Sequence, residues 1–168
     1  MIILYLIRHG ETVDNAAQIL QGHLQGELNE TGIKQAEEVR DLLVDEDIDV
    51  FVASDLKRSV DTCRIIARTH CKKVVTTPLL RERDWGDFTG AFIPDLKNKT
   101  WPENIESIEQ LKLRAQDFLV YIKANYPNKK VLAVGHGIIN KAIQSVYFKI
   151  PMNEVQKMTN AEVRRLKL

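Results

Sequence analysis

Short apolar runs occur at four places along the chain, and each ends abruptly. The runs at 2–7, 50–53 and 130–134 are dominated by Ile, Leu, Val and Ala, and their lengths are typical of buried strands. The segment 73–77 is rich in Val and Thr and ends at Pro78, which cannot donate to a strand ladder. We therefore predict four strands, separated by longer segments of mixed polarity.

Two of these longer segments have the spacing of amphipathic helices. The first helix is predicted to begin near Asn29 or Thr31 and to run to about Asp47. The second is predicted to have Ser54 as its N-cap and Asp55 in its first turn, where a carboxylate is favourable. The apolar faces expected for the two helices are Ile33, Ala36, Val39 and Leu43, and Leu56, Val60, Cys63 and Ala67.

Two further helices and a last strand are expected in the second half of the chain. Ser107, with Gln110 three residues later, forms a capping-box signature that opens a helix. Another helix covers about 138–148 and is broken by Pro151, and the tail at 161–168 is predicted to be one more strand. The apolar face expected for the helix after Ser107 is Ile108, Leu111, Ala115, Phe118, Leu119 and Ile122.

The alternation of strands and helices predicts an α/β fold with a mainly parallel central sheet. Helices on both faces of such a sheet give a three-layer α/β/α arrangement. We expect a single domain over 1–168, because this length is usual for one domain. Two long irregular segments, 8–29 and 80–106, interrupt the pattern, and loops of this length inside a compact domain are usually functional.

Charge and cysteine content narrow the classes of function. The chain has 24 Lys and Arg against 23 Asp and Glu, so we expect neither a nucleic acid nor a membrane surface as its partner. Cys63 and Cys71 show no paired metal-ligand spacing, which favours a reduced, cytoplasmic setting without a bound metal. The run 2–7 is far shorter than a membrane span of about 20 residues and lacks the flanks of a signal peptide.

Histidines and arginines gather near the ends of the predicted strands. Arg8 and His9 follow the first strand, Arg58 lies shortly after the second, and His136 follows the strand at 130–134. Parallel strands bring their carboxyl ends to one edge of a sheet, where helix N-termini present free N–H groups. Imidazole and guanidinium groups beside helix N-termini are suited to binding phosphate, so we predict a phosphate site at this edge.

Four segments in order resemble the motifs of the histidine phosphatase (phosphoglycerate mutase-like) superfamily. Residues 8–12 (Arg-His-Gly-Glu-Thr) resemble its signature, and 54–62 (Ser-Asp-Leu-Lys-Arg-Ser-Val-Asp-Thr) resemble its second motif. Residues 80–90 resemble its acid-bearing segment, and 134–137 (Val-Gly-His-Gly) resemble its second histidine motif. The motifs span most of the chain in the family's order, which makes the resemblance specific.

The resemblance implies a metal-independent phosphatase that hydrolyses phosphomonoesters through a covalent phosphohistidine and needs no cofactor. His9 would be the nucleophile and Glu82 the proton donor. Arg8 and Arg58 would bind the phosphate oxygens, because a guanidinium donates in a fork that fits phosphate. His136 would donate a hydrogen bond to phosphate as charge builds in the transition state.

Other positions match outer contacts of the family. Asn15 matches an asparagine that contacts phosphate, although a turn or cap role fits it equally. Gln21 and Gly22 resemble a Gln-Gly loop that contacts substrate, and the Gly137 N–H is an extra donor at a helix start. Trp85, Phe88 and Trp101 fit either a substrate wall or local core, whereas His23 and His70 are expected to be ordinary surface or loop residues.

The chain also departs from the family pattern in ways that affect substrate contacts. Ile138 and Lys141 stand where a glycine and an arginine are usual, and Thr89 replaces a usual Glu. Ile105-Glu106-Ser107 takes the place of a Gly-Glu-Ser motif. The segment from Gly90 to Ser107 is shorter than in many relatives, where it forms a lid, so we expect a more open site.

These features favour a phosphatase acting on a small phosphorylated metabolite, with a phosphoprotein as the other substrate class that fits. A mutase of the phosphoglycerate type is the second hypothesis, and the short segment before Ser107 disfavours it. A third hypothesis is a regulatory module that binds phosphate without turnover, which an intact Glu82 disfavours. The sequence specifies neither the substrate nor the oligomeric state.

Overall fold

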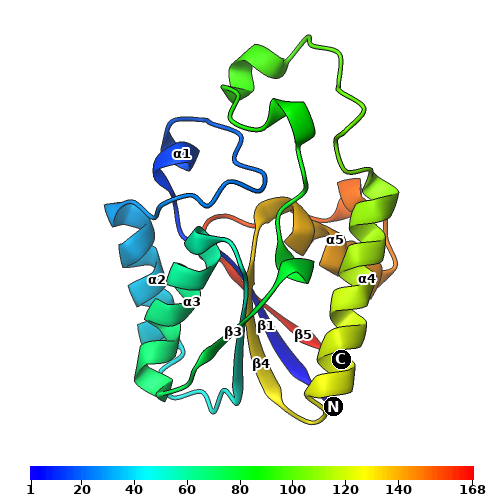
Figure 1. The fold of residues 1–168 in the computed structure, drawn as a ribbon. Coiled ribbons are helices and arrows are strands. Elements are labelled where there is room, and N and C mark those ends of the chain that lie inside the picture. Colours follow the sequence, from blue (N-terminus) through cyan, green and yellow to red (C-terminus); the bar gives the residue numbers. More distant parts are fainter.

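The computed structural model describes residues 1–168 and has one five-stranded sheet with helices on both faces (Figure 1). The strand order is β3-β2-β4-β1-β5, and only β5 runs antiparallel to its neighbour. This confirms the predicted α/β class and the mainly parallel sheet. The strands are β1 (Ile3–Arg8), β2 (Val50–Ser54), β3 (Val74–Thr77), β4 (Lys130–Gly135) and β5 (Val163–Lys167). The helices are α1 (Val13–Ala16), α2 (Glu30–Leu42), α3 (Lys57–Ala67), α4 (Ile108–Asn125) and α5 (Gly137–Phe148).

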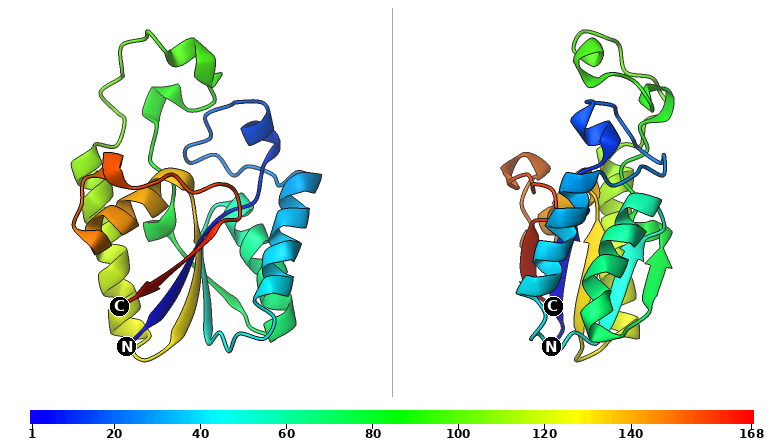
Figure 2. Two further views of the ribbon diagram at one scale, coloured as in Figure 1. Left: turned by 180° about the vertical axis from the view of Figure 1, so that it is seen from behind. Right: turned by 90° about the vertical axis from the view of Figure 1, so that its left-hand side faces the viewer.

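Alternation along the strands decides which helices cover which face of the sheet. Leu4 and Leu6 of β1 are buried in an apolar cluster with α4 and α5. Tyr5 and Ile7 point the other way and are buried with residues of α2 and α3. Figures 1 and 2 show the result, with the sheet lying between two helical layers.

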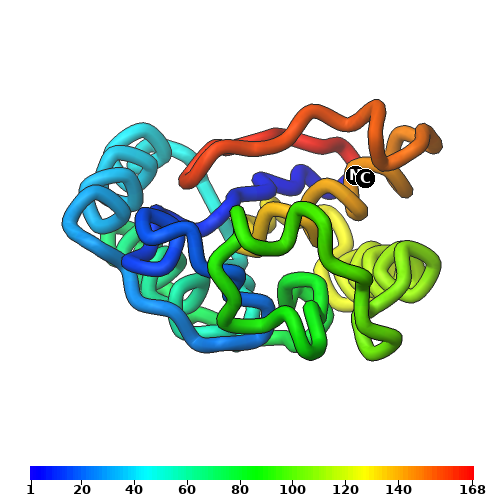
Figure 3. The backbone as a smooth tube through the Cα atoms, turned by 90° about the horizontal axis from the view of Figure 1, so that it is seen from above, coloured from blue at the N-terminus to red at the C-terminus, as the bar shows by residue number.

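The carboxyl ends of the parallel strands lie at one end of the molecule, and both termini lie at the other (Figure 1). The segments 9–29 and 78–107 rise above the strand ends, and Figure 3 shows them crossing over that end side by side. Backbone hydrogen bonds join them: Leu20 donates to the Ala91 carbonyl (2.9 Å) and Gly90 donates to the Leu20 carbonyl (2.7 Å). The two irregular segments therefore brace each other.

Most element boundaries agree with the sequence prediction, and the end of α2 does not. Ser107 and Gln110 form the expected capping box of α4, and the predicted last strand is present as β5. However, α2 ends at Leu42, several residues before the predicted end. The Glu46 carboxylate accepts hydrogen bonds from the Tyr5 hydroxyl (2.8 Å) and the Lys130 ammonium (3.2 Å), so the acidic run turns back toward the sheet.

The prediction that Ser54 caps a helix was wrong. Ser54 is the last residue of β2, and the N-cap position of α3 is Leu56, which has no side-chain cap. The Ser54 hydroxyl instead lies 2.9 Å from Nε2 of His136. The apolar faces were also drawn too wide, because Ile33 and Ile108 are 39% and 37% exposed.

Candidate active site

The carboxyl ends of β1 and β4 bring the two predicted histidines together. Arg8 pairs in register with Gly135, so His9 and His136 follow on neighbouring strands. The centroids of their rings lie 5.1 Å apart, in an edge-to-face arrangement. A cavity of about 160 Å³, called the His9 cavity below, opens at this point. Eight predicted site residues line it: Arg8, His9, Asn15, Gln21, Gly22, Arg58, Glu82 and Gly137.

His9 is buried, with 3% of its surface exposed, and its ring is held in one tautomer. Nδ1 lies 2.7 Å from the Gly10 carbonyl, which only accepts hydrogen bonds, so Nδ1 carries the proton. Nε2 therefore keeps its lone pair. Burial, and then the charges of Arg58 and Arg8, lower the pKa of His9 to about 3. The imidazole is neutral at pH 7, which is the form that acts as a nucleophile.

The loop after β1 needs a glycine because it passes very close to the first turn of α2. A Cβ atom on Gly10 would lie 2.5 Å from the carbonyl oxygen of Gly32. The Gly10 N–H donates to the Thr62 hydroxyl (3.1 Å), which donates in turn to the Arg58 carbonyl (2.8 Å). Thr62 thus ties the His9 loop to the start of α3.

Arg58 is 1% exposed and its guanidinium is largely occupied by the protein itself. Nη2 donates to the Gly22 carbonyl (2.8 Å), Nη1 to the Leu24 carbonyl, and Nε to Nδ1 of His136 (3.2 Å). Burial lowers the pKa of Arg58 to about 10, so it stays charged at neutral pH. Arg58 therefore fixes the loop at 22–25 while its remaining donor capacity faces the His9 cavity.

His136 lies behind Arg58 and does not line the His9 cavity. Its Nδ1 accepts from Arg58, so Nε2 carries the proton, between the hydroxyls of Ser54 (2.9 Å) and Ser59 (3.1 Å). Burial and the nearby Arg58 hold the pKa of His136 well below its usual value. In this structure His136 positions Arg58, because both of its nitrogens are already bonded within the protein.

Arg8 and the N-terminus of α5 keep unused donors beside His9. Arg8 donates through Nη1 to the Met158 carbonyl (2.8 Å), and its buried Nε has no partner. The Gly137 N–H lies in the first turn of α5, where no carbonyl of the same helix can accept it. An ideal Cβ on Gly137 would lie 3.5 Å from Cζ of Arg8, so these groups are neighbours. The Arg8 Nε and the Gly137 N–H can therefore both donate hydrogen bonds to an anion bound beside His9.

Glu82 is anchored at the same helix start. Its Oε1 accepts from the N–H groups of Ile138 (3.1 Å), Ile139 (3.0 Å) and Arg83 (2.9 Å). The backbone carbonyl of Glu82 accepts from Nε2 of His23 (2.8 Å), so His23 supports the acid-bearing segment and is more than an ordinary loop residue. These bonds fix the Glu82 carboxyl on the wall of the His9 cavity.

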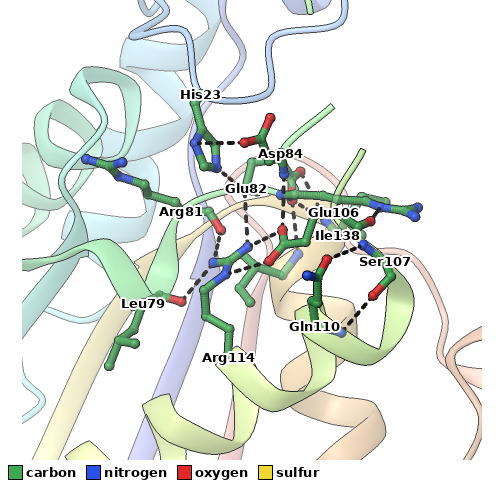
Figure 4. Close-up of polar contacts among 12 residues, drawn as sticks. His23, Leu79, Arg81, Glu82, Asp84, Glu106, Ser107, Gln110, Arg114 and Ile138 are labelled. Atoms are coloured by element: carbon green, nitrogen blue, oxygen red, sulfur yellow. Dashed lines mark hydrogen bonds and ion pairs between the residues drawn. The ribbon is translucent and has the colours of Figure 1, made fainter. Parts of the chain in front are cut away.

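A partly buried ion pair, shown in Figure 4, holds the acid-bearing segment against α4. Nε and Nη2 of Arg114 donate to the two carboxylate oxygens of Glu106 (3.0 and 2.7 Å). Nη1 of Arg114 also donates to the carbonyls of Leu79 (3.0 Å) and Arg81 (2.6 Å), and Nη2 to that of Glu82 (3.2 Å). Sequence reasoning missed Arg114, and the one available signal was a cation beside the buried Ala115 on an amphipathic helix.

The outer predicted residues lie where they were expected, with cap and contact roles combined. Asn15 completes the capping box of α1 and also lines the His9 cavity. The side-chain oxygen of Gln21 accepts a hydrogen bond from the Thr12 hydroxyl (3.1 Å), and this bond does not use the amide nitrogen of Gln21. Lining residues that sequence reasoning missed are Ile19, Leu20, Ile93 and Lys157, and Ile138, which departs from the family pattern, lines the cavity as well. Lys157 had no signal, because it comes from the loop between α5 and β5, far from every motif.

His70 lies away from this site, since its Nε2 meets the Glu46 carbonyl (3.0 Å) and its ring packs on Phe51. No group of three or more His, Cys, Asp or Glu side chains is arranged to hold a metal ion. None of the helices has both the length and the apolar character needed to cross a membrane.

Known proteins are similar to this chain in sequence and in fold. The profile of the histidine phosphatase superfamily (branch 1) matches residues 4–168. A metal-independent phosphoserine phosphatase of Arabidopsis thaliana is 35% identical over 95% of this chain and 74% of its own length. An uncharacterised phosphatase of Bacillus subtilis is 38% identical over 82% of this chain and 72% of its own length. The structure of mycobacterial glucosyl-3-phosphoglycerate phosphatase with VO3 superposes with a TM-score of 0.88, at 26% identity, over 98% of this chain and 92% of that one. The chain therefore belongs to the histidine phosphatase superfamily, and it is an enzyme of the phosphohistidine type.

Proposed function

We propose that this chain hydrolyses small phosphomonoesters, with His9 as the residue that carries the phosphoryl group. The observation that carries the proposal is the state of His9: a neutral imidazole, with Nδ1 bonded to Gly10 and Nε2 unprotonated at the His9 cavity. Because the Gly10 carbonyl holds the Nδ1 proton, Nε2 has the lone pair that attacks phosphorus.

In the first step, Nε2 of His9 forms a bond to phosphorus as the ester P–O bond breaks. Arg8, the remaining donor of Arg58 and the Gly137 N–H would bind the non-bridging oxygens. Asn15 and Gln21 would complete the ring of donors from the loop after β1. Because these groups are positioned before substrate arrives, they stabilise the charge of the transition state without reorganising.

Glu82 would supply the proton to the departing alkoxide. Two N–H groups of α5 hold its carboxyl on the wall of the His9 cavity, so it can reach an ester oxygen in line with His9. In the second step the Glu82 carboxylate takes a proton from water, the water oxygen attacks the phosphoryl group, and the P–N bond breaks. Inorganic phosphate leaves, and the lone pair returns to Nε2.

The substrate class is supported by the size of the site and by the relatives. The His9 cavity is small, and the curated phosphatase from Arabidopsis is named for phosphoserine. A small phosphorylated metabolite fits this cavity directly. Transfer of the phosphoryl group to water is what separates this proposal from a mutase, which returns the group to a second hydroxyl of its substrate.

The proposal is tested by trapping the intermediate. Acid quench during turnover followed by intact-mass and peptide analysis should find one phosphoryl group, on His9. His9→Ala should lower kcat by about 1,000-fold or more, whereas His70→Ala, a matched imidazole far from the cavity, should change it little. Phosphate on another residue, or full activity in His9→Ala, would falsify the proposal. Tight binding of phosphate esters without phosphate release would favour a non-catalytic module.

A further inference from the structure

An apolar hollow of about 610 Å³ opens directly beside the His9 cavity. Apart from Lys97, all of its lining side chains are apolar: Leu20, Trp85, Phe88, Ile93, Pro94, Leu96 and Trp101. Trp101 is 55% exposed and Ile93 is 47% exposed. Contiguous exposed apolar surface of this kind on a folded chain usually marks a binding site.

The walls of the apolar hollow are held in place by contacts made outside it. The Arg83 guanidinium stacks on the rings of Trp85 (4.8 Å) and Trp101 (5.4 Å), and its Nε donates to the Glu106 carbonyl (2.8 Å). The two indole rings meet edge to face, 5.5 Å apart. Arg83 itself is almost buried, so it supports the tryptophans from behind.

The opposite wall is fixed by the backbone pairing of the two irregular segments. Ile93 donates its N–H to the Gln18 carbonyl (2.8 Å), and Leu20 donates to the Ala91 carbonyl (2.9 Å). The hollow therefore exists before a ligand binds. A preformed apolar surface loses little conformational entropy when it is covered.

The apolar hollow and the His9 cavity adjoin each other and share part of their walls. Leu20, Trp85 and Ile93 line both. A phosphate group held by Arg8 and Arg58 would direct the rest of its ester across these three side chains. The carboxylate of a substrate such as phosphoserine would find a single cation on this surface, Lys97, among side chains that are otherwise apolar.

Because the two cavities share these three side chains, we infer that the apolar hollow binds the organic group of the substrate. This group would be an alkyl or aryl chain. The inference rests on the proposed function and adds the substrate class to it. The alternative is a substrate whose organic group carries a carboxylate, which would pair with Lys157. Lys157 lines the His9 cavity but not the apolar hollow.

The test uses n-alkyl phosphates, because ethyl, butyl and hexyl phosphate have leaving groups of nearly equal acidity. Their kcat/KM should rise about two- to fourfold for each methylene that enters the hollow. Leu96→Asn should flatten this rise, because Leu96 lines the hollow and not the His9 cavity. Leu113→Asn is the matched control, since this exposed leucine lies on α4, and it should keep the full slope.

Binding is measured separately with n-alkylphosphonates, which bind without being hydrolysed. The two tryptophans of the chain, Trp85 and Trp101, both line the hollow, so their fluorescence reports its occupancy. Hydrolysis of all esters with equal kcat/KM, or a preference for phosphoserine that Lys157→Ala abolishes, would overturn the inference and leave the proposed function intact. Phosphonate binding that tightens with chain length, without phosphate release from any ester, would support the hollow and overturn the proposed function. Length-independent phosphonate binding would overturn the inference.

Discussion

The His9 cavity and the apolar hollow share three side chains and are built in opposite ways. In the His9 cavity, His9 and Arg58 are only 3% and 1% exposed, and Arg58 bonds to Gly22, Leu24 and His136 at once. In the hollow, Trp101 and Ile93 stay exposed and the backbone comes from an irregular segment. His9, Arg58 and Gly137 therefore lie at the ends of the sheet strands and helices, whereas most side chains of the hollow lie on the irregular segment 78–107, where sequence varies more readily.

The largest effect expected on the cavity side is the loss of the Glu82 proton. Glu82→Gln should lower kcat/KM for alkyl phosphates by about 100- to 10,000-fold, because an alkoxide needs a proton in order to leave. An aryl phosphate with an acidic phenol should lose far less. Glu103→Gln removes an exposed carboxylate and should behave as wild type for both esters. Equal losses for alkyl and aryl esters would contradict the proton-donor role.

The next effect tests the ion pair that supports the cavity from outside. Arg114→Met leaves Glu106 without its partner, and the free energy of unfolding should fall by about 3 kcal/mol. Chemical denaturation measures this change. The double variant Arg114→Met/Glu106→Leu should recover part of the loss, because it removes the unpaired charge as well. Arg40→Met, which disrupts surface pairs with Glu37 and Asp41, should leave the free energy of unfolding nearly unchanged.

The two buried histidines predict how stability depends on pH. The pKa of His9 is about 3 in the folded state, and that of His136 is also lowered, so the unfolded chain binds more protons below about pH 6.5. Stability is then fully present above that pH and falls as the pH drops from about 6.5 toward 3, by roughly 1 kcal/mol per pH unit for each histidine. His9→Asn should reduce this slope, as urea titrations at several pH values would reveal. A slope unchanged in His9→Asn would show that His9 does not titrate in this way.

The smallest effect is expected in the apolar hollow. Trp101→Ala should lower the free energy of unfolding by only about 1 kcal/mol, because the ring is half exposed and mainly stacks on Arg83. Phe118→Ala in α4 is the buried control and should cost about 3–5 kcal/mol. If Trp101→Ala lowered the free energy of unfolding as much as Phe118→Ala, the hollow would be part of the structural core rather than a binding surface.

The sequence predicts the sheet and the cavity well because both depend on local signals. The apolar run of β1 and the capping box at Ser107 can each be recognised from a few adjacent residues. The positions of Arg8, His9 and Arg58 follow from their places after β1 and β2, since parallel strands end at one edge. These features need no knowledge of distant contacts.

The rest depends on contacts between elements that are far apart in the chain. Serine often caps helices, but the Ser54 hydroxyl lies within hydrogen-bond distance of His136, 82 residues later in the chain. The pairing of Arg58 with His136 likewise requires the relative positions of α3 and β4. Arg114 and Lys157 act through backbone and cavity geometry that no short motif records.

The position of β1 has a consequence for how the protein is made. β1 is made before the other strands of this sheet, yet its two neighbours are β4 and β5, the last two strands of the sheet to be made. The His9 carbonyl itself accepts hydrogen bonds from Asn160 (3.1 Å) and Ala161 (3.2 Å). During synthesis, the loop that carries His9 therefore cannot form these contacts until the segment with Asn160 and β5 has also been made.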